Sequence, residues 1–126
     1  MKVQPKIIVV DDSLFIRKML VEILANNGFV DVIEAGNGKE ALELYKKNSP
    51  DLMMLDLIMP EMGGLDVLDS LSREAAKVKV IIVTAVGGPV IENETKGAFG
   101  GVVGYISKPF KENEIIQAVK GVLTLL

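Results

Sequence analysis

Residues 51–60 have the sequence Asp-Leu-Met-Met-Leu-Asp-Leu-Ile-Met-Pro, and this stretch decides the fold. Its apolar run, residues 52–55, lies between the turn residues 48–50 (Asn-Ser-Pro) and Pro60, which is typical of a strand buried on both faces. Asp56 follows the run, where a carboxylate is costly unless a polar group meets it. Ligands bind at the carboxyl ends of strands in open parallel sheets. Asp56 is therefore either a cap of the following loop or the centre of a site.

The same pattern of an apolar run followed by a turn occurs four more times. Further strands are predicted at residues 6–10, 30–35, 80–84 and 102–107. Between and after them, apolar residues recur at helical spacing in residues 15–24, 39–47, 65–71 and 115–126, and Ser13 is a plausible N-cap for the first helix. Strand and helix alternate five times. We therefore predict an α/β fold with a doubly wound, five-stranded parallel sheet and helices on both faces, as in flavodoxin.

The fourth helix is predicted to be irregular or shortened. Residues 87–89 are Gly-Gly-Pro, and six of the 12 glycines lie between Gly87 and Gly104. An interior glycine costs a helix about 1 kcal/mol relative to alanine. Residues 90–96 could form a short helix. A loop, a shortened helix and a helix that forms in one state only all remain open for residues 86–101, which we expect to be mobile and part of an output surface.

Composition restricts the classes of function. The chain has 126 residues, which fits one domain over residues 1–126, and its net charge of −3 argues against a nucleic-acid surface. It has no cysteine, as fits a reducing, cytoplasmic setting, and no apolar stretch long enough to span a membrane. It also has no histidine, so any histidine chemistry must come from a partner and any metal must be held by oxygen.

Four of the five predicted strands end in a side chain that can carry chemistry. These are Asp11 with Asp12, then Asp56, Thr84 and Lys108. Singly, each has an ordinary explanation, since acidic residues favour a helix start and threonine or lysine is common in loops. The carboxyl ends of parallel strands share one edge, however. Three carboxylates, a hydroxyl and an ammonium on that edge are hard to explain as caps, and we interpret them as one site.

The residue types of this site indicate phosphoryl transfer. Carboxylates at close quarters repel one another unless a cation joins them, and Mg²⁺ prefers such oxygen ligands. A carboxylate such as Asp56 can act as a nucleophile on phosphorus and form an aspartyl phosphate. Thr84 can donate a hydrogen bond to one phosphoryl oxygen, and Lys108 can pair with another. The predicted chemistry is therefore Mg²⁺-dependent transfer of a phosphoryl group to Asp56.

Over essentially its whole length the chain resembles the response-regulator receiver domains. The resemblance is carried by residues 9–13 (Val-Val-Asp-Asp-Ser), 55–64 (Leu-Asp-Leu-Ile-Met-Pro-Glu-Met-Gly-Gly), 84–85 (Thr-Ala) and 108–110 (Lys-Pro-Phe). Residues 11–17 are most similar to stand-alone chemotaxis regulators of the CheY type. The implied fold is CheY-like, and the implied organisation is a single receiver domain.

The resemblance implies a role for each site residue. Asp56 would accept phosphate from a histidine kinase. Asp12 directly, Asp11 through water, Asp56 itself and the backbone carbonyl of Ile58 would hold Mg²⁺. Lys108 and Thr84 would contact the phosphoryl group, and the Lys108-Pro109 peptide would be cis. Tyr105, three residues before Lys108, would turn inward behind Thr84 as a switch.

The resemblance also implies partners. The chain would be a signalling protein that catalyses its own phosphorylation and dephosphorylation, not an enzyme, and would act on an output protein such as a motor or adaptor component. It would bind neither nucleic acid nor membrane, and it would be a monomer with a phosphorylation-linked dimer as the alternative. Ile58 and Val86 are apolar where the family tunes access of water to the acyl phosphate, which predicts slow self-hydrolysis.

Three alternatives remain. The chain could be the receiver of a longer regulator with a DNA-binding output. A phosphatase of the haloacid-dehalogenase type also uses a nucleophilic Asp, but it carries a second Asp two residues later, where this chain has Ile58. A nucleotide- or flavin-binding module would need a glycine-rich loop after the first strand, where Asp11 and Asp12 would instead repel a phosphate.

Overall fold

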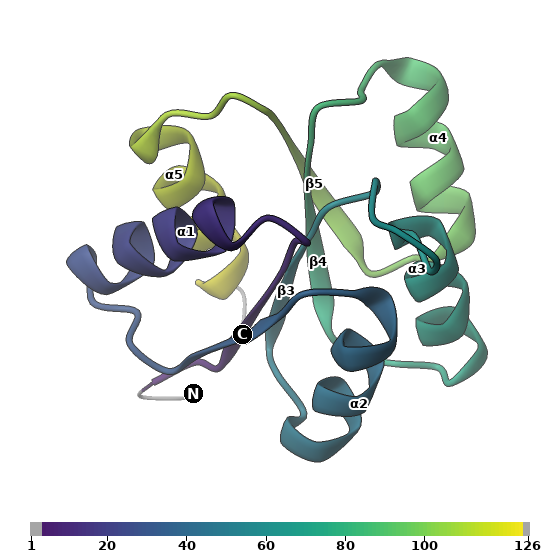
Figure 1. The fold of residues 1–126 in the computed structure, drawn as a ribbon, viewed down its shortest axis with the longest axis horizontal. Coiled ribbons are helices and arrows are strands. Elements are labelled where there is room, and N and C mark those ends of the chain that lie inside the picture. The colour runs from purple at the N-terminus through teal and green to yellow at the C-terminus, as the bar shows by residue number, and fades with distance from the viewer. Residues whose placement is uncertain (1–3, 125–126) are drawn as a thin grey trace.

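Five strands and five helices alternate along the chain in the computed structural model, which describes residues 4–124 (Figure 1). The strand order is β2-β1-β3-β4-β5 and every pairing is parallel, which confirms the predicted fold class. The elements are β1 (Ile7–Val10), α1 (Leu14–Asn26), β2 (Val32–Ala35), α2 (Gly38–Asn48), β3 (Leu52–Leu55), α3 (Gly64–Arg73), β4 (Lys79–Thr84), α4 (Pro89–Ala98), β5 (Val102–Ser107) and α5 (Glu112–Leu123).

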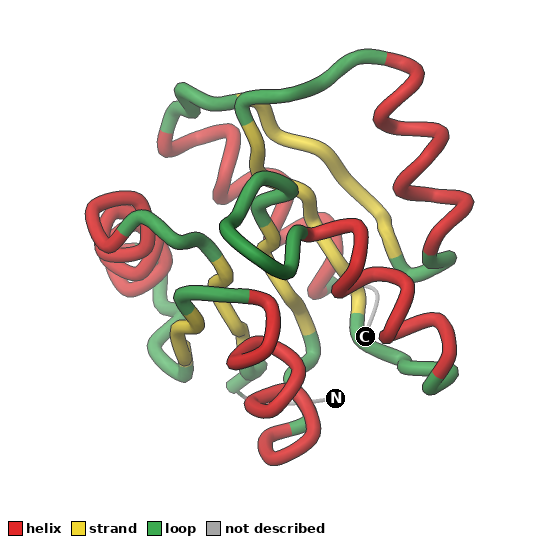
Figure 2. Tube along the Cα trace, turned by 45° about the vertical axis from the view of Figure 1, so that its right-hand side comes forward, coloured by secondary structure: helices red, strands yellow, loops and turns green. Residues whose placement is uncertain are grey.

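The sheet is a layer between two groups of helices. α1 and α5 cover one face, and α2, α3 and α4 cover the other (Figures 1 and 2). All four residues of β1 and of β3 are buried. On β3, Met53 and Leu55 pack into the core beneath α2 and α3, whereas Leu52 and Met54 pack into the core beneath α1 and α5. A strand that supplies both cores must be apolar at every position, which explains the continuous run.

The helices begin close to the carboxyl edge of the sheet and are capped there. The hydroxyl of Ser13 accepts a hydrogen bond from the Ile16 amide (3.2 Å), as predicted, and the Asn37 side chain accepts one from the Glu40 amide (2.8 Å). The predicted last helix extends to Leu126, which lies outside the described residues. Among residues 4–124, no helix has the length and apolar character needed to cross a membrane.

The fourth helix differs from its prediction. α4 is a regular helix of ten residues, as long as α3, and neither irregular nor shortened relative to it. Its glycines do not interrupt it because Gly88 lies just before the helix, with a φ of +107° that suits glycine, and Pro89 occupies the first turn, where no amide donor is needed. Gly97 comes only in the last turn. These glycines therefore destabilise the helix little, because they lie outside it or at its end.

Candidate functional site

Three carboxylates meet at the carboxyl edge of the two central strands. Asp11 follows β1 and Asp56 follows β3, and these strands pair with Val10 opposite Leu55. The Asp56 amide donates to the Val10 carbonyl (3.0 Å), which continues the ladder by one residue. Asp11 and Asp56 are only 2% and 5% exposed, whereas Asp12 is exposed. One carboxylate oxygen from each of Asp11, Asp12 and Asp56 lies within 4.8 Å of the others, so the predicted cluster forms.

Lys108 joins two of these carboxylates from the end of β5. Its Nζ donates to Asp11 Oδ2 (2.6 Å) and to Asp56 Oδ2 (2.9 Å). Burial on its own lowers the pKa of Lys108, but the hydrogen bonds to Asp11 and Asp56 and their charges outweigh it, so the pKa is raised above its usual value. The side chain is therefore an ammonium at neutral pH and offsets one of the three negative charges. The Lys108-Pro109 peptide is cis, as the resemblance implied.

Thr84 reaches the same edge from the end of β4. It is 5% exposed and pairs with Ser107 on β5, the residue before Lys108. Its carbonyl accepts a hydrogen bond from the Lys108 amide (2.9 Å), and its hydroxyl accepts one from the Val86 amide (3.4 Å). Thr84 and Lys108 are thus adjacent in the sheet although 24 positions separate their numbers.

The loop after Asp56 is tightly folded. The Ile58 amide donates to Asp56 Oδ1 (3.2 Å), and the Gly64 amide donates to the Leu57 carbonyl (3.0 Å). A Cβ at position 64 would lie 2.6 Å from the Asp56 carbonyl oxygen and 2.7 Å from the Leu57 Cα, so only glycine fits. The side chain of Ile58 is 61% exposed. The loop therefore orients the Asp56 carboxylate through its backbone and presents an apolar group beside it.

The donor set of the cluster suits a hard dication. Asp11, Asp12 and Asp56 carry three negative charges, of which Lys108 offsets one, and all the donors are oxygens. Mg²⁺ is bound in this way, by a few carboxylates with water and phosphoryl oxygens completing an octahedron. The carboxylates therefore fit the predicted Mg²⁺. The participation of the Ile58 carbonyl stays a prediction.

Tyr105 takes a different place from the other predicted site residues. It lies on β5, and its hydroxyl donates to the Glu92 carbonyl of α4 (2.7 Å) and contacts the hydroxyl of Thr95. Thr95 is fully buried in α4 and donates to the same carbonyl (3.0 Å). Tyr105 therefore links β5 to α4, and its role as a switch stays a prediction. Sequence reasoning missed Thr95, because no local pattern shows which strand residue a helix hydroxyl will meet.

Sequence reasoning also missed a pair beside the cluster, Arg17 and Glu34. Arg17 of α1 donates from Nη1 to the Asp11 carbonyl (2.7 Å) and from Nε to Glu34 Oε1 on β2 (3.2 Å). A basic residue five positions after Asp12 was the available signal, but a lysine follows it, and spacing alone does not tell which of the two turns toward the site.

Comparisons with known proteins agree with this geometry. A model described as the response regulator receiver domain matches residues 7–120. The chemotaxis protein CheY of Bacillus subtilis (strain 168) is 37% identical over 118 residues, covering 94% of this chain and 97% of that protein. The probable transcriptional regulator ycf27 of Porphyridium aerugineum is 37% identical over 118 residues, but these cover only 48% of that protein. The structure of Vibrio cholerae chemotaxis protein CheY4 matches with a TM-score of 0.87 at 27% identity, covering 95% of this chain and 99% of that one. This chain therefore belongs to the response regulator receiver domains of two-component signalling.

Proposed function

We propose that this receiver domain is a phosphoacceptor: Asp56 takes a phosphoryl group from the phosphohistidine of a histidine kinase. The observation that carries the proposal is the pairing of a 5%-exposed Asp56 with Lys108 Nζ at 2.9 Å, beside Asp11 and Asp12. A buried carboxylate among two others and one ammonium is an arrangement for holding a cation and an anionic group together. The absence of histidine from the chain agrees with a donor histidine on a partner.

The reaction forms one bond and breaks one. A carboxylate oxygen of Asp56 attacks phosphorus while the phosphorus–nitrogen bond of the phosphohistidine breaks, and its electron pair stays on the imidazole nitrogen. Lys108 then exchanges its contact with the Asp56 carboxylate for one with a phosphoryl oxygen, and the hydroxyl of Thr84 donates to another. Asp11, Asp12, Asp56 and the Ile58 carbonyl would hold Mg²⁺, which would supply positive charge to neutralise the phosphoryl oxygens.

The phosphorylated state would be read on the side of the molecule that carries α4, β5 and α5. Phosphate can shift a conformational equilibrium only if it binds one arrangement more tightly than the other. Thr84 contacts the phosphoryl group in this proposal, and Tyr105 joins β5 to α4 at Glu92 and Thr95. Movement of Thr84 toward the phosphate would free space for Tyr105 to turn inward, which changes the α4 contact that an output protein meets.

Chemotaxis is the output that we propose, with a motor or adaptor component as the partner. Support comes from the CheY of Bacillus subtilis, which this chain matches over 97% of that protein's length. The ycf27 match, which covers 48% of its protein, favours the alternative of a receiver within a longer regulator. We further propose that the domain is not a phosphatase, because the apolar Ile58 stands where such an enzyme needs a second carboxylate. We place it in the cytoplasm as a monomer that binds neither nucleic acid nor membrane, with a phosphorylation-linked dimer as the alternative.

The test is intact mass after incubation with acetyl phosphate, with and without Mg²⁺. The parent chain should gain one phosphoryl group when Mg²⁺ is present, and Asp56→Asn should gain none. Asp66→Asn is the matched control, because Asp66 is exposed in the first turn of α3 and its loss changes the net charge equally. The absence of an adduct on the parent, or the same adduct on Asp56→Asn, would overturn the proposal.

A further inference from the structure

The guanidinium of Arg17 hydrogen-bonds to the backbone of the cation site at the Asp11 carbonyl. Arg17 lies in the first turn of α1, and long helical side chains there point back toward the helix N-terminus. Nη1 donates to the Asp11 carbonyl at 2.7 Å, while Nε donates to Glu34 Oε1 at 3.2 Å. The side chain is only 16% exposed. Its two hydrogen bonds join the end of β1 to β2 through one rigid planar group.

The carbonyl that Arg17 holds belongs to the peptide between Asp11 and Asp12. Asp11 is also held by its amide, which donates to the Ala35 carbonyl (3.1 Å), and by its carboxylate, which accepts from the Ser13 amide (2.9 Å) and from Lys108. The exposed carboxylate of Asp12 has no hydrogen-bond partner within residues 4–124. Its direction therefore depends on the orientation of the peptide that precedes it.

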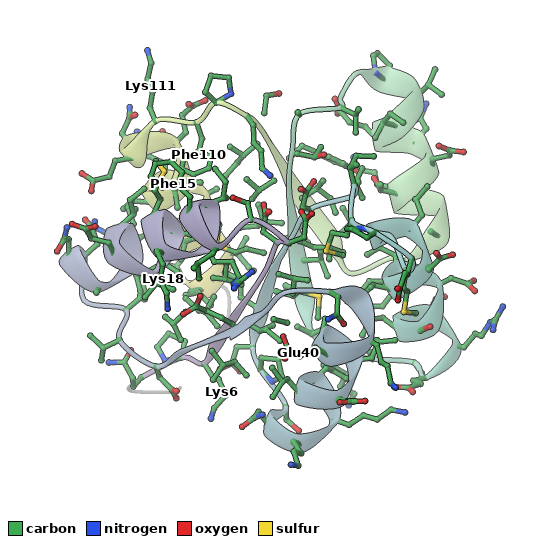
Figure 3. All side chains as sticks on the ribbon, in the orientation of Figure 1. Lys6, Phe15, Lys18, Glu40, Phe110 and Lys111 are labelled. Carbon is green, nitrogen blue, oxygen red and sulfur yellow. The ribbon has the colours of Figure 1, made fainter. Side chains whose placement is uncertain are left out.

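The surroundings of Arg17 are shaped for this contact. A Cβ at position 36 would lie 3.3 Å from Arg17 Nη1, so Gly36 leaves the space that the guanidinium fills. Glu34 also accepts a hydrogen bond from Lys18 (2.8 Å), but Lys18 is 62% exposed and projects from α1 (Figure 3). Two adjacent cations thus share one carboxylate, and of the two, only Arg17 donates to Asp11.

We propose that Arg17, anchored by Glu34, is a positioning residue of the cation site: it fixes the Asp11–Asp12 peptide and so aims the Asp12 carboxylate at the bound Mg²⁺. This inference rests on the proposed function for its cation. It assigns Arg17 no contact with the phosphoryl group. Groups that orient metal ligands from outside the ligand set typically change metal affinity 10- to 100-fold when they are removed.

Removal of Arg17 should change the affinity for Mg²⁺ in opposite directions, depending on whether its charge or its positioning of Asp11 dominates. Loss of a positive charge near three carboxylates makes the site more negative, so Coulomb attraction alone would tighten Mg²⁺ binding. Loss of the hold on the Asp11 carbonyl lets the Asp12 carboxylate sample other directions, and Mg²⁺ binding weakens. The sign of the change therefore separates the two effects. Lys18 measures the charge effect alone, because it pairs with the same Glu34 and does not donate to Asp11.

The experiment is a calorimetric titration of Mg²⁺ into the unphosphorylated parent chain, Arg17→Met and Lys18→Met. We expect Arg17→Met to bind Mg²⁺ about tenfold more weakly than the parent, while Lys18→Met binds equally or slightly more tightly. Equal or tighter binding by Arg17→Met would overturn the inference. Failure of the parent to bind Mg²⁺ would overturn the proposed function instead, and this inference with it.

A second variant guards against misfolding. Circular dichroism and thermal unfolding without Mg²⁺ will show whether Arg17→Met keeps the native fold. Arg17→Lys keeps the charge but lacks the planar fork that bonds Asp11 and Glu34 together, so it should also bind Mg²⁺ more weakly. Parent-like Mg²⁺ affinity in a folded Arg17→Lys would show that the planar fork is not needed, and it would overturn the inference even if Arg17→Met does not fold.

Discussion

Two loops leave the same edge of the sheet and differ in how tightly they pack. The loop between β3 and α3 is closely packed: a Cβ on Gly64, the first residue of α3, would meet the Asp56 carbonyl at 2.6 Å, and a Cβ on Gly38, the first residue of α2, would meet Met62 of this loop at 2.8 Å. In the loop between β4 and α4, a Cβ on Gly87 would meet its nearest neighbour only at 3.8 Å. The loop that carries Asp56 has no room for an added methyl group at these contacts, whereas the loop beside Thr84 has room for one at position 87.

The largest expected effect would come from filling the tight loop. Gly64→Ala should destabilise the fold by about 1–3 kcal/mol, because the added methyl group meets backbone atoms that cannot turn away. Gly87→Ala is the matched control and should stay within about 1 kcal/mol of the parent. Urea unfolding followed by circular dichroism measures both. Equal effects at the two positions would contradict the contrast between the loops.

The next effect concerns water at the tight loop. Ile58 is 61% exposed beside Asp56 and cannot orient a water molecule, so Ile58→Asn should speed hydrolysis of the phosphorylated form several-fold. Decay of the phosphorylated species, followed by intact mass after removal of the donor, measures the rate. Val90→Asn on α4, where Val90 is 75% exposed, is the control and should decay as the parent does. An unchanged rate in Ile58→Asn would remove the role given to this side chain.

A smaller effect is expected in α4, the helix that follows the more loosely packed loop. Gly97 lies in the last turn of α4, and a Cβ there would meet nothing within 4 Å. Gly97→Ala should therefore stabilise the domain, by about 0.5–1 kcal/mol, through the lower conformational entropy of the unfolded chain. The midpoint of thermal unfolding should rise. A fall would mean that α4 packs more closely than its surroundings indicate.

The smallest effect concerns Glu34, on the β2 side of the same edge. The hydrogen bond from Lys18, opposed by burial and assisted by Arg17, lowers the pKa of Glu34. Its stabilising contribution is therefore present at neutral pH and lost as the pH falls through that lowered value. Glu34→Gln should cost a few tenths of a kcal/mol at neutral pH, because Glu34 is only partly buried and solvent screens its ion pairs. In urea unfolding, the difference in free energy of unfolding between Glu34→Gln and the parent should disappear in acid. A difference of the same size at both pH values would contradict the stabilising role given to the Glu34 carboxylate.

The parts of the site that could be predicted from the sequence are those that a strand end specifies. An apolar run followed directly by Asp11, Asp56 or Thr84 places each side chain at one edge as soon as the sheet is parallel. Lys108 follows by the same rule. These positions do not depend on packing, because the end of each apolar run and the alternation of strands and helices determine where a strand stops.

The parts that could not be predicted depend on contacts between elements. The steric need for glycine at position 64 comes from the curl of the loop over Asp56, and the meeting of Tyr105 with Thr95 comes from the docking of α4 on β5. The prediction of an irregular or shortened α4 was wrong, because the number of glycines in residues 87–104 does not say where they lie relative to the helix. Gly88 and Gly97 lie before the helix and in its last turn, where they interrupt little.

The contact between Tyr105 and α4 can be followed by the intrinsic fluorescence of the domain. The chain has two tyrosines and no tryptophan, so light that excites tyrosine but not phenylalanine gives emission from Tyr45 and Tyr105 alone. The phenol of Tyr105 is hydrogen-bonded to the Glu92 carbonyl, and the yield of tyrosine emission responds to such a bond. Tyr45→Phe, a change on the far helix α2, would leave Tyr105 as the single emitter. The emission of Tyr105 would then report changes in its contact with α4 without an attached dye.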